Sequence, residues 1–157
     1  SDLPSFMSYD MAGRTYRYFK GEALYPFGYG LSYTNFTYGN LQAPVQLKKG
    51  DTAKVTVTVK NTGSRDGEEV VQLYVSHQNA SGKAPIRSLK GFQRIALKAG
   101  ESKTVSFTLT AEQFSLVNEE GKTYQPTGKI VVSAGGGQPG VKIKTSSSVI
   151  SKTISIL

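Results

Sequence analysis

The sequence of 157 residues contains no cysteine and a single histidine. The missing cysteines exclude disulfide bonds, thiolate metal sites and cysteine nucleophiles. One imidazole group excludes any site that needs two, and the polar neighbours of His77 in residues 76–82 predict an ordinary loop histidine. We therefore expect neither a metal ion nor a cofactor.

Long apolar runs are also missing, since no stretch approaches the roughly 18 residues of a membrane-spanning helix. The first five residues lack the positive start and apolar core of a secretory signal. Any export signal is therefore expected further upstream or already removed. On this evidence we expect no membrane partner.

Acidic residues are scarce: eleven Asp and Glu stand against nineteen Lys and Arg, which gives a net charge of +8, and none follows Glu120. Proteins that bind nucleic acid, anionic membranes or acidic polysaccharides share such an excess. Here the last lysines stand singly at alternating positions, which instead predicts solvated strand faces and no nucleic-acid partner. These lysines are Lys122, Lys129, Lys142, Lys144 and Lys152.

Alternating apolar and polar residues mark strands from about Thr34 onward. In residues 53–60, alanine and valine alternate with lysine and threonine, a period of two that buries one face. The pattern recurs, after Gly, Asn and Asp turns, at residues 71–75, 105–109, 130–134, 141–143 and 154–156. Only residues 110–114 suit a helical turn, with Thr110 as the cap and Gln113 at the capping-box position. Residues 34–157 are therefore predicted to form an all-β antiparallel sandwich.

Aromatic residues are concentrated at the other end of the chain, where eleven of the sixteen occur by residue 38. Residues 1–33, which we call the strap, show neither helical nor strand periodicity, and Gly and Pro interrupt them. Their aromatic surface is too large for a disordered linker, so an irregular segment packed on a surface is predicted. The aromatics either stack on sugar rings, as in a carbohydrate-binding module, or fill an interface with a neighbouring domain. Nine of these rings are spread along the irregular strap, and this distribution favours the interface.

Catalytic groups are hard to find in this sequence. A glycosidase needs two carboxyl groups that converge on one bond, whereas Glu68-Glu69 and Glu119-Glu120 are adjacent pairs in expected turns. Neighbours on an extended chain point to opposite sides. The glycine-rich residues 135–140 precede an expected strand and lack the Lys-Ser/Thr ending of a phosphate-binding loop, so a hairpin connection is predicted. No catalytic residue is therefore expected.

Four stretches resemble glycoside hydrolase family 3: residues 13–19 (GRTYRYF), 24–34 (LYPFGYGLSYT), 85–95 (PIRSLKGFQRI), and Val117 followed by residues 128–135 (GKIVVSAG). In that family the first two belong to a linker between the second, α/β-sandwich domain and a C-terminal fibronectin type III-like domain. The resemblance implies an immunoglobulin-like sandwich over residues 34–157 and an interdomain linker over residues 1–33. It also implies that the catalytic nucleophile and acid/base lie in domains that this sequence does not contain.

The resemblance further implies a non-catalytic module that stabilises and positions the catalytic domains of an exo-β-glycosidase, in the periplasm or outside the cell. Residues 13–18 resemble the xylosidase and arabinosidase branch more than the glucosidase branch, which implies β-1,4-xylosides, with a β-glucosidase parent as the alternative. The catalytic domains of the same enzyme are the expected partner, and polysaccharide contact stays open. The expected docking residues are Arg14, Tyr16, Arg17, Tyr18, Phe19, Tyr25, Pro26, Phe27 and Tyr29.

Overall fold

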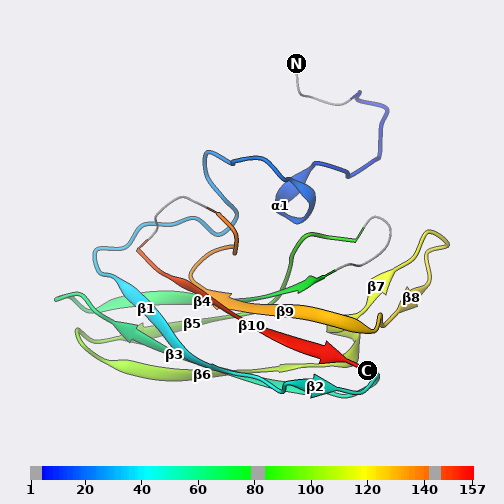
Figure 1. Cartoon of the computed structure of the whole chain (residues 1–157). Helices are drawn as coiled ribbons and strands as arrows, with labels where there is room; N and C mark the ends of the chain where they lie inside the picture. The colour runs from blue at the N-terminus through cyan, green and yellow to red at the C-terminus, as the bar shows by residue number, and fades with distance from the viewer. Residues whose placement is uncertain (1–4, 79–83, 142–145) are drawn as a thin grey trace.

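The computed structural model describes residues 5–78, 84–141 and 146–157. These residues form two stacked sheets and a small hairpin, which confirms the predicted all-β sandwich (Figure 1). One sheet has the strand order β1 (Phe36–Gln42), β3 (Ala53–Asn61), β6 (Ser102–Leu109). The other has the order β2 (Gln46–Leu47), β10 (Val149–Ile156), β9 (Gly128–Gly135), β4 (Gly67–His77), β5 (Ser88–Leu97). The hairpin pairs β7 (Leu116–Val117) with β8 (Thr123–Tyr124).

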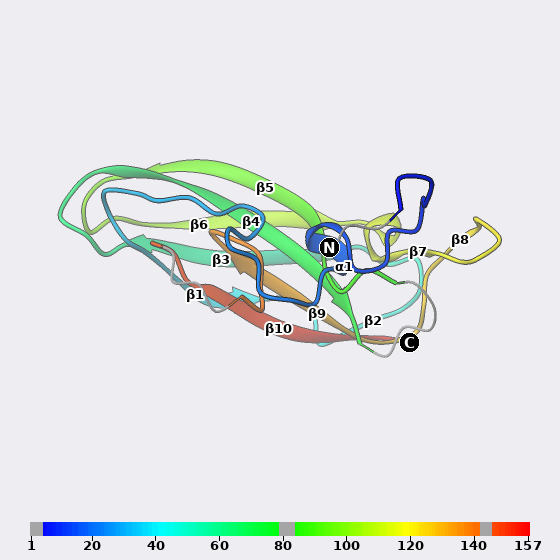
Figure 2. The same ribbon diagram turned by 90° about the horizontal axis from the view of Figure 1, so that it is seen from above.

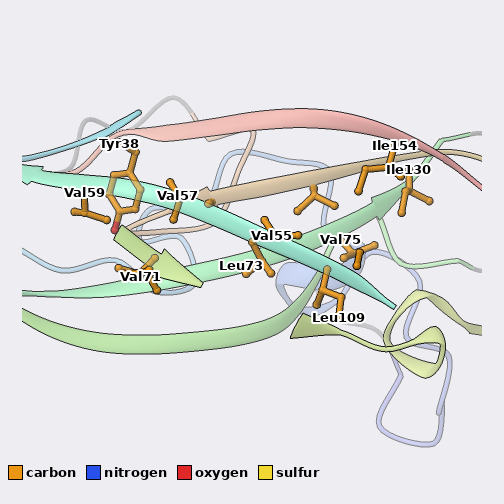
Figure 3. Close-up of a cluster of buried hydrophobic side chains, with 14 of the residues drawn as sticks. Tyr38, Val55, Val57, Val59, Val71, Leu73, Val75, Leu109, Ile130 and Ile154 are labelled. Carbon is orange, nitrogen blue, oxygen red and sulfur yellow. The ribbon is translucent and has the colours of Figure 1, made fainter. Parts of the chain in front are cut away.

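The core lies between the two sheets and is built from the alternating positions of their strands (Figure 3). Along β3 every second residue from Ala53 to Asn61 is buried, as the period of two predicts. Antiparallel pairing brings Val57 opposite Val105 and Leu73 opposite Ala134. Phe107 is only half-buried and packs at the margin of this core.

The helical turn predicted at residues 110–114 is present as the 3-10 helix η1 (Ala111–Phe114). The backbone amide of Thr110 donates a hydrogen bond to Gln113 Oε1 at 2.9 Å, the contact that the capping-box spacing provides. Phe114 is fully buried and fixes this turn against the core.

Some local predictions were wrong. The strap contains a helical turn, α1 (Thr15–Tyr18), which its irregular pattern did not indicate. His77 is the last residue of β4 and not a loop residue, because β4 pairs with β9 as far as Ile130. Val141 lies in no strand, and Ile143 lies outside the described residues. The strands β9 and β10 do pair as consecutive antiparallel neighbours, but the second strand begins at Val149 and not at Val141.

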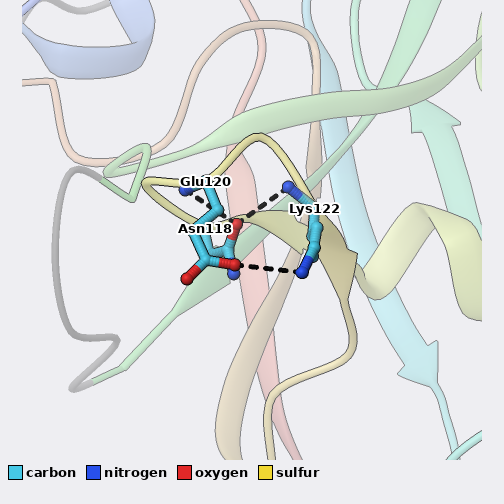
Figure 4. Close-up of polar contacts among 3 residues, drawn as sticks. All are labelled: Asn118, Glu120 and Lys122. Carbon is cyan, nitrogen blue, oxygen red and sulfur yellow. Dashed lines mark hydrogen bonds and ion pairs between the residues drawn. The ribbon is translucent and has the colours of Figure 1, made fainter.

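The pair Glu119-Glu120 occupies an exposed turn, as predicted, between β7 and β8 (Figure 4). Asn118 Oδ1 accepts the backbone amides of Glu120 at 3.1 Å and of Lys122 at 2.8 Å. Lys122 Nζ lies 3.1 Å from Glu120 Oε2, so this lysine belongs to a turn and not to a strand face. Lys129 is exposed on β9 and Lys152 half-exposed on β10. Two further lysines, Lys142 and Lys144, lie outside the described residues.

Among the described residues, no helix is both long and apolar enough to cross a membrane.

Candidate docking surface

The strap lies on the outer face of the five-stranded sheet, across β4 and β9 (Figures 1 and 2). Residues 71–75 of β4 are buried without interruption, although a strand with one solvated face alternates. The odd positions face the core, while Gln72 and Tyr74 point outward and are still only 6% and 0% exposed. The strap therefore acts as a third layer over this part of the sheet.

Tyr16, on α1, is the main aromatic contact between the strap and the sheet. Its ring stacks on Phe27 with centroids 4.2 Å apart and meets Tyr74 edge-on at 6.3 Å. The backbone amide of Leu89, on β5, donates a hydrogen bond to Tyr16 Oη at 3.2 Å. These three contacts tie α1 to the second half of the strap and to two strands.

Backbone hydrogen bonds hold the strap at two further points. The carbonyl of Arg17 accepts the amide of Ile86 at 2.7 Å, and the amide of Phe27 donates to Gln138 Oε1 at 3.0 Å. Gly28 adopts a φ of +77°, and a Cβ there would lie 2.5 Å from Gln72 Oε1. Only glycine therefore permits this close approach.

The polar side chains under the strap form hydrogen bonds with one another and with a backbone carbonyl. The Tyr74 hydroxyl donates to Gln72 Oε1 at 2.5 Å, and Gln72 Nε2 donates to the carbonyl of Gly136 at 3.1 Å. Burial raises the pKa of Tyr74 well above its usual range, and Tyr16 adds to this effect. The hydroxyl therefore remains a protonated donor at physiological pH.

The outward face of the strap is rich in exposed apolar side chains. Phe6 is fully exposed, Tyr9 and Tyr33 are more than 90% exposed, and Leu24 is 81% exposed. Two open grooves of about 790 Å³ each flank Tyr18 and Phe19, one extending to Tyr9 and Ile86 and the other to Tyr25 and Phe27. Contiguous apolar surface of this kind is uncommon on monomeric proteins and marks interaction sites.

The predicted docking residues fall into two groups. Pro26 is buried on the sandwich, while Tyr16 and Phe27 form the stacked pair above it. Phe19, Tyr25 and one face of Phe27 are open to solvent, these side chains being 40%, 69% and 44% exposed. The Arg17 guanidinium lies 5.7 Å from the ring centre of Tyr18, and the rings of Tyr25 and Tyr29 are 5.2 Å apart. Arg14, Tyr18 and Tyr29 are half-buried. Docking of these residues on other domains stays a prediction.

The sequence analysis missed the receiving side of this contact, namely Gln72, Tyr74 and Gln138. A signal was available in residues 70–75 (VVQLYV), where large side chains occupy both faces of a strand. Such a run is typical of a strand covered on both sides. Val70 and Phe92, which are 42% and 70% exposed, extend the apolar surface beside the strap.

The pair Glu68-Glu69 was wrongly assigned to a turn, because both residues belong to β4. Their side chains point to opposite faces: Glu68 pairs with Arg94 at the surface, whereas Glu69 is 6% exposed. Glu69 accepts hydrogen bonds from Tyr38 Oη at 2.7 Å and from Ser147 Oγ at 2.9 Å. Burial raises the pKa of Glu69, although both hydrogen bonds oppose that effect. Two carboxyl groups on opposite faces cannot act on one glycosidic bond.

Metal-binding chemistry finds no support either: the described ranges contain no group of three or more potential ligands among His, Asp and Glu. Burial lowers the pKa of His77, and the nearby Lys90 lowers it further, so this imidazole is neutral at physiological pH.

Comparison with known proteins agrees with the fold. Residues 69–138 match the fibronectin type III-like domain family. The xylan 1,4-beta-xylosidase of Xylanibacter ruminicola is 43% identical over 122 residues, which cover 77% of this chain and 14% of that protein. The periplasmic beta-glucosidase of Salmonella typhimurium is 41% identical over 155 residues, covering 89% of this chain and 20% of that protein.

Solved structures give the same picture. The beta-glucosidase from Listeria innocua in complex with glucose matches with a TM-score of 0.74 at 37% identity, over 85% of this chain and 17% of that one. A beta-glucosidase from Erythrobacter marinus matches with a TM-score of 0.76, also at 37% identity, over 90% of this chain and 18% of that one. The chain thus spans a fifth or less of each of these relatives. It belongs to the fibronectin type III-like domain family, in the form carried by family 3 glycoside hydrolases of the β-xylosidase and β-glucosidase type.

Proposed function

We propose that this chain is a non-catalytic module of a family 3 exo-β-glycosidase and that it stabilises and positions the catalytic domains of the same enzyme. The observation that supports this proposal is the two-sided strap. Its inner side is held on the sandwich by Tyr16, Pro26 and the backbone amide of Phe27, while its outer side presents Phe19, Tyr25, the ring of Phe27 and two apolar grooves. In this proposal residues 1–33 are the docking segment and residues 34–157 the sandwich that supports it.

The parent enzyme is proposed to hydrolyse β-glycosides of plant polysaccharide fragments, β-1,4-xylosides in the first place, in the periplasm or outside the cell. The xylan 1,4-beta-xylosidase of Xylanibacter ruminicola, which is 43% identical, supports xylosides, and the periplasmic beta-glucosidase supports the compartment. The catalytic rates of the parent enzyme with aryl-xyloside and aryl-glucoside substrates decide between the two sugars. A preference for the glucoside would refute the xyloside assignment alone.

The docking proposal is tested by producing the chain and the remainder of its parent enzyme as separate polypeptides and measuring their association calorimetrically. Replacing Phe19 and Tyr25 by serine is expected to weaken association by on the order of 100-fold without lowering the stability of the chain. Val117→Ser is the control, since Val117 is 66% exposed, close to the 69% of Tyr25, but lies on β7. Undiminished affinity of the double variant would refute the proposal.

Exposed tyrosines also suit a carbohydrate-binding module, because Tyr9 and Tyr33 are almost fully accessible for stacking on sugar rings. Titration of the isolated chain with xylo-oligosaccharides, followed by tyrosine fluorescence, separates the two functions. Docking predicts no saturable change. Turnover of an aryl-xyloside by the isolated chain would contradict a non-catalytic role.

A further inference from the structure

Arg17 and Lys90 meet at the edge of the five-stranded sheet, where β5 is the last strand: Arg17 contacts Ser88 of β5, and Lys90 is the second residue after Ser88. Leu73 pairs with Gly91 and Tyr74 with Leu89, so Lys90 is the additional residue of a β-bulge. Bulges redirect side chains and occur often beside functional sites. The backbone of Lys90 is also held in place, because its carbonyl oxygen accepts a hydrogen bond from Gln113 Nε2 at 2.7 Å.

Arg17 reaches this edge from the strap. Its carbonyl accepts the amide of Ile86 at 2.7 Å, and its Nη2 donates to the hydroxyl of Ser88 at 3.4 Å. Ser88 precedes Lys90 by two residues on β5. The strap therefore holds Arg17 beside the strand that carries Lys90, and the β-bulge positions Lys90.

No carboxylate of the described residues lies within ion-pair distance of Arg17 or Lys90. Burial lowers the pKa of Lys90, and the charge of Arg17 lowers it further. The other titratable neighbour is His77, which burial and Lys90 keep neutral. A half-buried cation beside a second cation destabilises the isolated chain, and a counter-charge would relieve this repulsion.

We propose that Arg17 and Lys90 together receive an aspartate or glutamate side chain of the catalytic domains that dock on the strap. This proposal rests on the proposed function and names the chemistry of the partner surface. An Arg fork and a Lys point charge suit one carboxylate, which Arg binds through two parallel hydrogen bonds. Arg17 lines one of the two apolar grooves together with Tyr18 and Phe19, so apolar surface adjoins this site on the strap. A second copy of this chain is disfavoured as the occupant, because each copy carries a net charge of +8.

The proposal predicts opposite effects of one substitution in two settings. In the isolated chain, Lys90→Gln removes the repulsion from Arg17 and is expected to raise the melting temperature by roughly 2–4 °C. In the intact parent enzyme the same substitution removes an ion pair, so the melting temperature is expected to fall and to depend less on salt. Lys54→Gln, at an exposed position on β3, is the matched control and is expected to have no effect in either setting.

A change of the same sign in both settings would overturn the carboxylate proposal. A second variant of the intact enzyme separates this test from the test of docking. In this double variant Phe19 and Tyr25 are both replaced by serine, and its melting temperature reports on docking alone. Suppose that the double variant lowers the melting temperature of the intact enzyme, while Lys90→Gln changes the melting temperature with the same sign in the isolated chain and in the intact enzyme. In that case only the carboxylate proposal fails. If the double variant does not change the melting temperature of the intact enzyme, the proposed docking function is refuted, and the carboxylate proposal, which rests on it, is refuted as well.

Discussion

At the scale of single residues, the side chain of Tyr16 contacts both the strap and the sandwich. Tyr16 contacts Phe27 within the strap, and both Tyr74 and the amide of Leu89 on the sandwich. Its loss therefore removes aromatic contact area and leaves a backbone donor without its partner.

Tyr16→Ala is expected to lower the free energy of unfolding by about 1–3 kcal/mol. Tyr33→Ala removes the same side chain from a position that is 94% exposed, and it is expected to change that free energy by less than about 0.5 kcal/mol. Urea unfolding of both variants gives the comparison. Equal effects would show that the strap is not held through Tyr16.

Glu69 gives the chain a pH-dependent stability. Since burial raises its pKa above the ordinary value of 4.5, the folded state holds a proton that the unfolded state releases more readily. Stability is then fully present below the unfolded pKa and declines as the pH rises through the raised folded pKa. Glu69→Gln keeps an acceptor for Tyr38 and carries no charge.

We therefore expect the stability of Glu69→Gln to improve relative to the natural chain as the pH rises above 4.5. Urea unfolding at a series of pH values measures this difference. Glu68→Gln, one residue away on the exposed face, is the control for the loss of a carboxylate from β4. A pH profile of Glu69→Gln parallel to that of the natural chain would contradict the assignment.

At the scale of elements, the strap behaves as a layer added to a sandwich that has its own core. The buried cluster between the sheets is drawn from residues 36–156, so the strap contributes none of its members. What the strap covers is the outward pair Gln72 and Tyr74.

Removing residues 1–33 is therefore expected to leave a folded sandwich that is less stable by about 2–5 kcal/mol, because Tyr74 and its neighbours become exposed. Circular dichroism and urea unfolding of the truncated chain measure fold and stability. Loss of all cooperative unfolding would mean that the strap belongs to the core, and an unchanged midpoint would mean that it is loosely attached.

The elements differ in how far the sequence predicts them. The alternation in residues 53–60 and the capping position of Gln113 are local signals, and both were confirmed. The burial of Glu69 was not predictable in this way, because it depends on Tyr38 and Ser147, which are 31 and 78 residues away. Tyr74 likewise owes its burial to Tyr16 and the rest of the strap. The bulge at Lys90 arises from the register between two strands, which a single strand's pattern does not contain.

At the scale of the whole molecule, the chain is asymmetric. The strap lies on the side of the five-stranded sheet (Figure 1). The apolar grooves are lined mainly by strap residues, Arg17 belongs to the strap, and Lys90 lies on β5 of the same sheet. The outer face of β3 in the opposite sheet presents exposed or half-exposed lysine and threonine side chains. One side of the molecule is therefore suited to docking and the other to water.

Hydrogen–deuterium exchange of the intact parent enzyme, compared with the isolated chain, tests this docking most directly. The backbone amides of residues 13–31 are expected to exchange at least about 10-fold more slowly in the intact enzyme, while β3 and β6 exchange at the same rate in both. Equal exchange of residues 13–31 in the two forms would contradict docking through the strap.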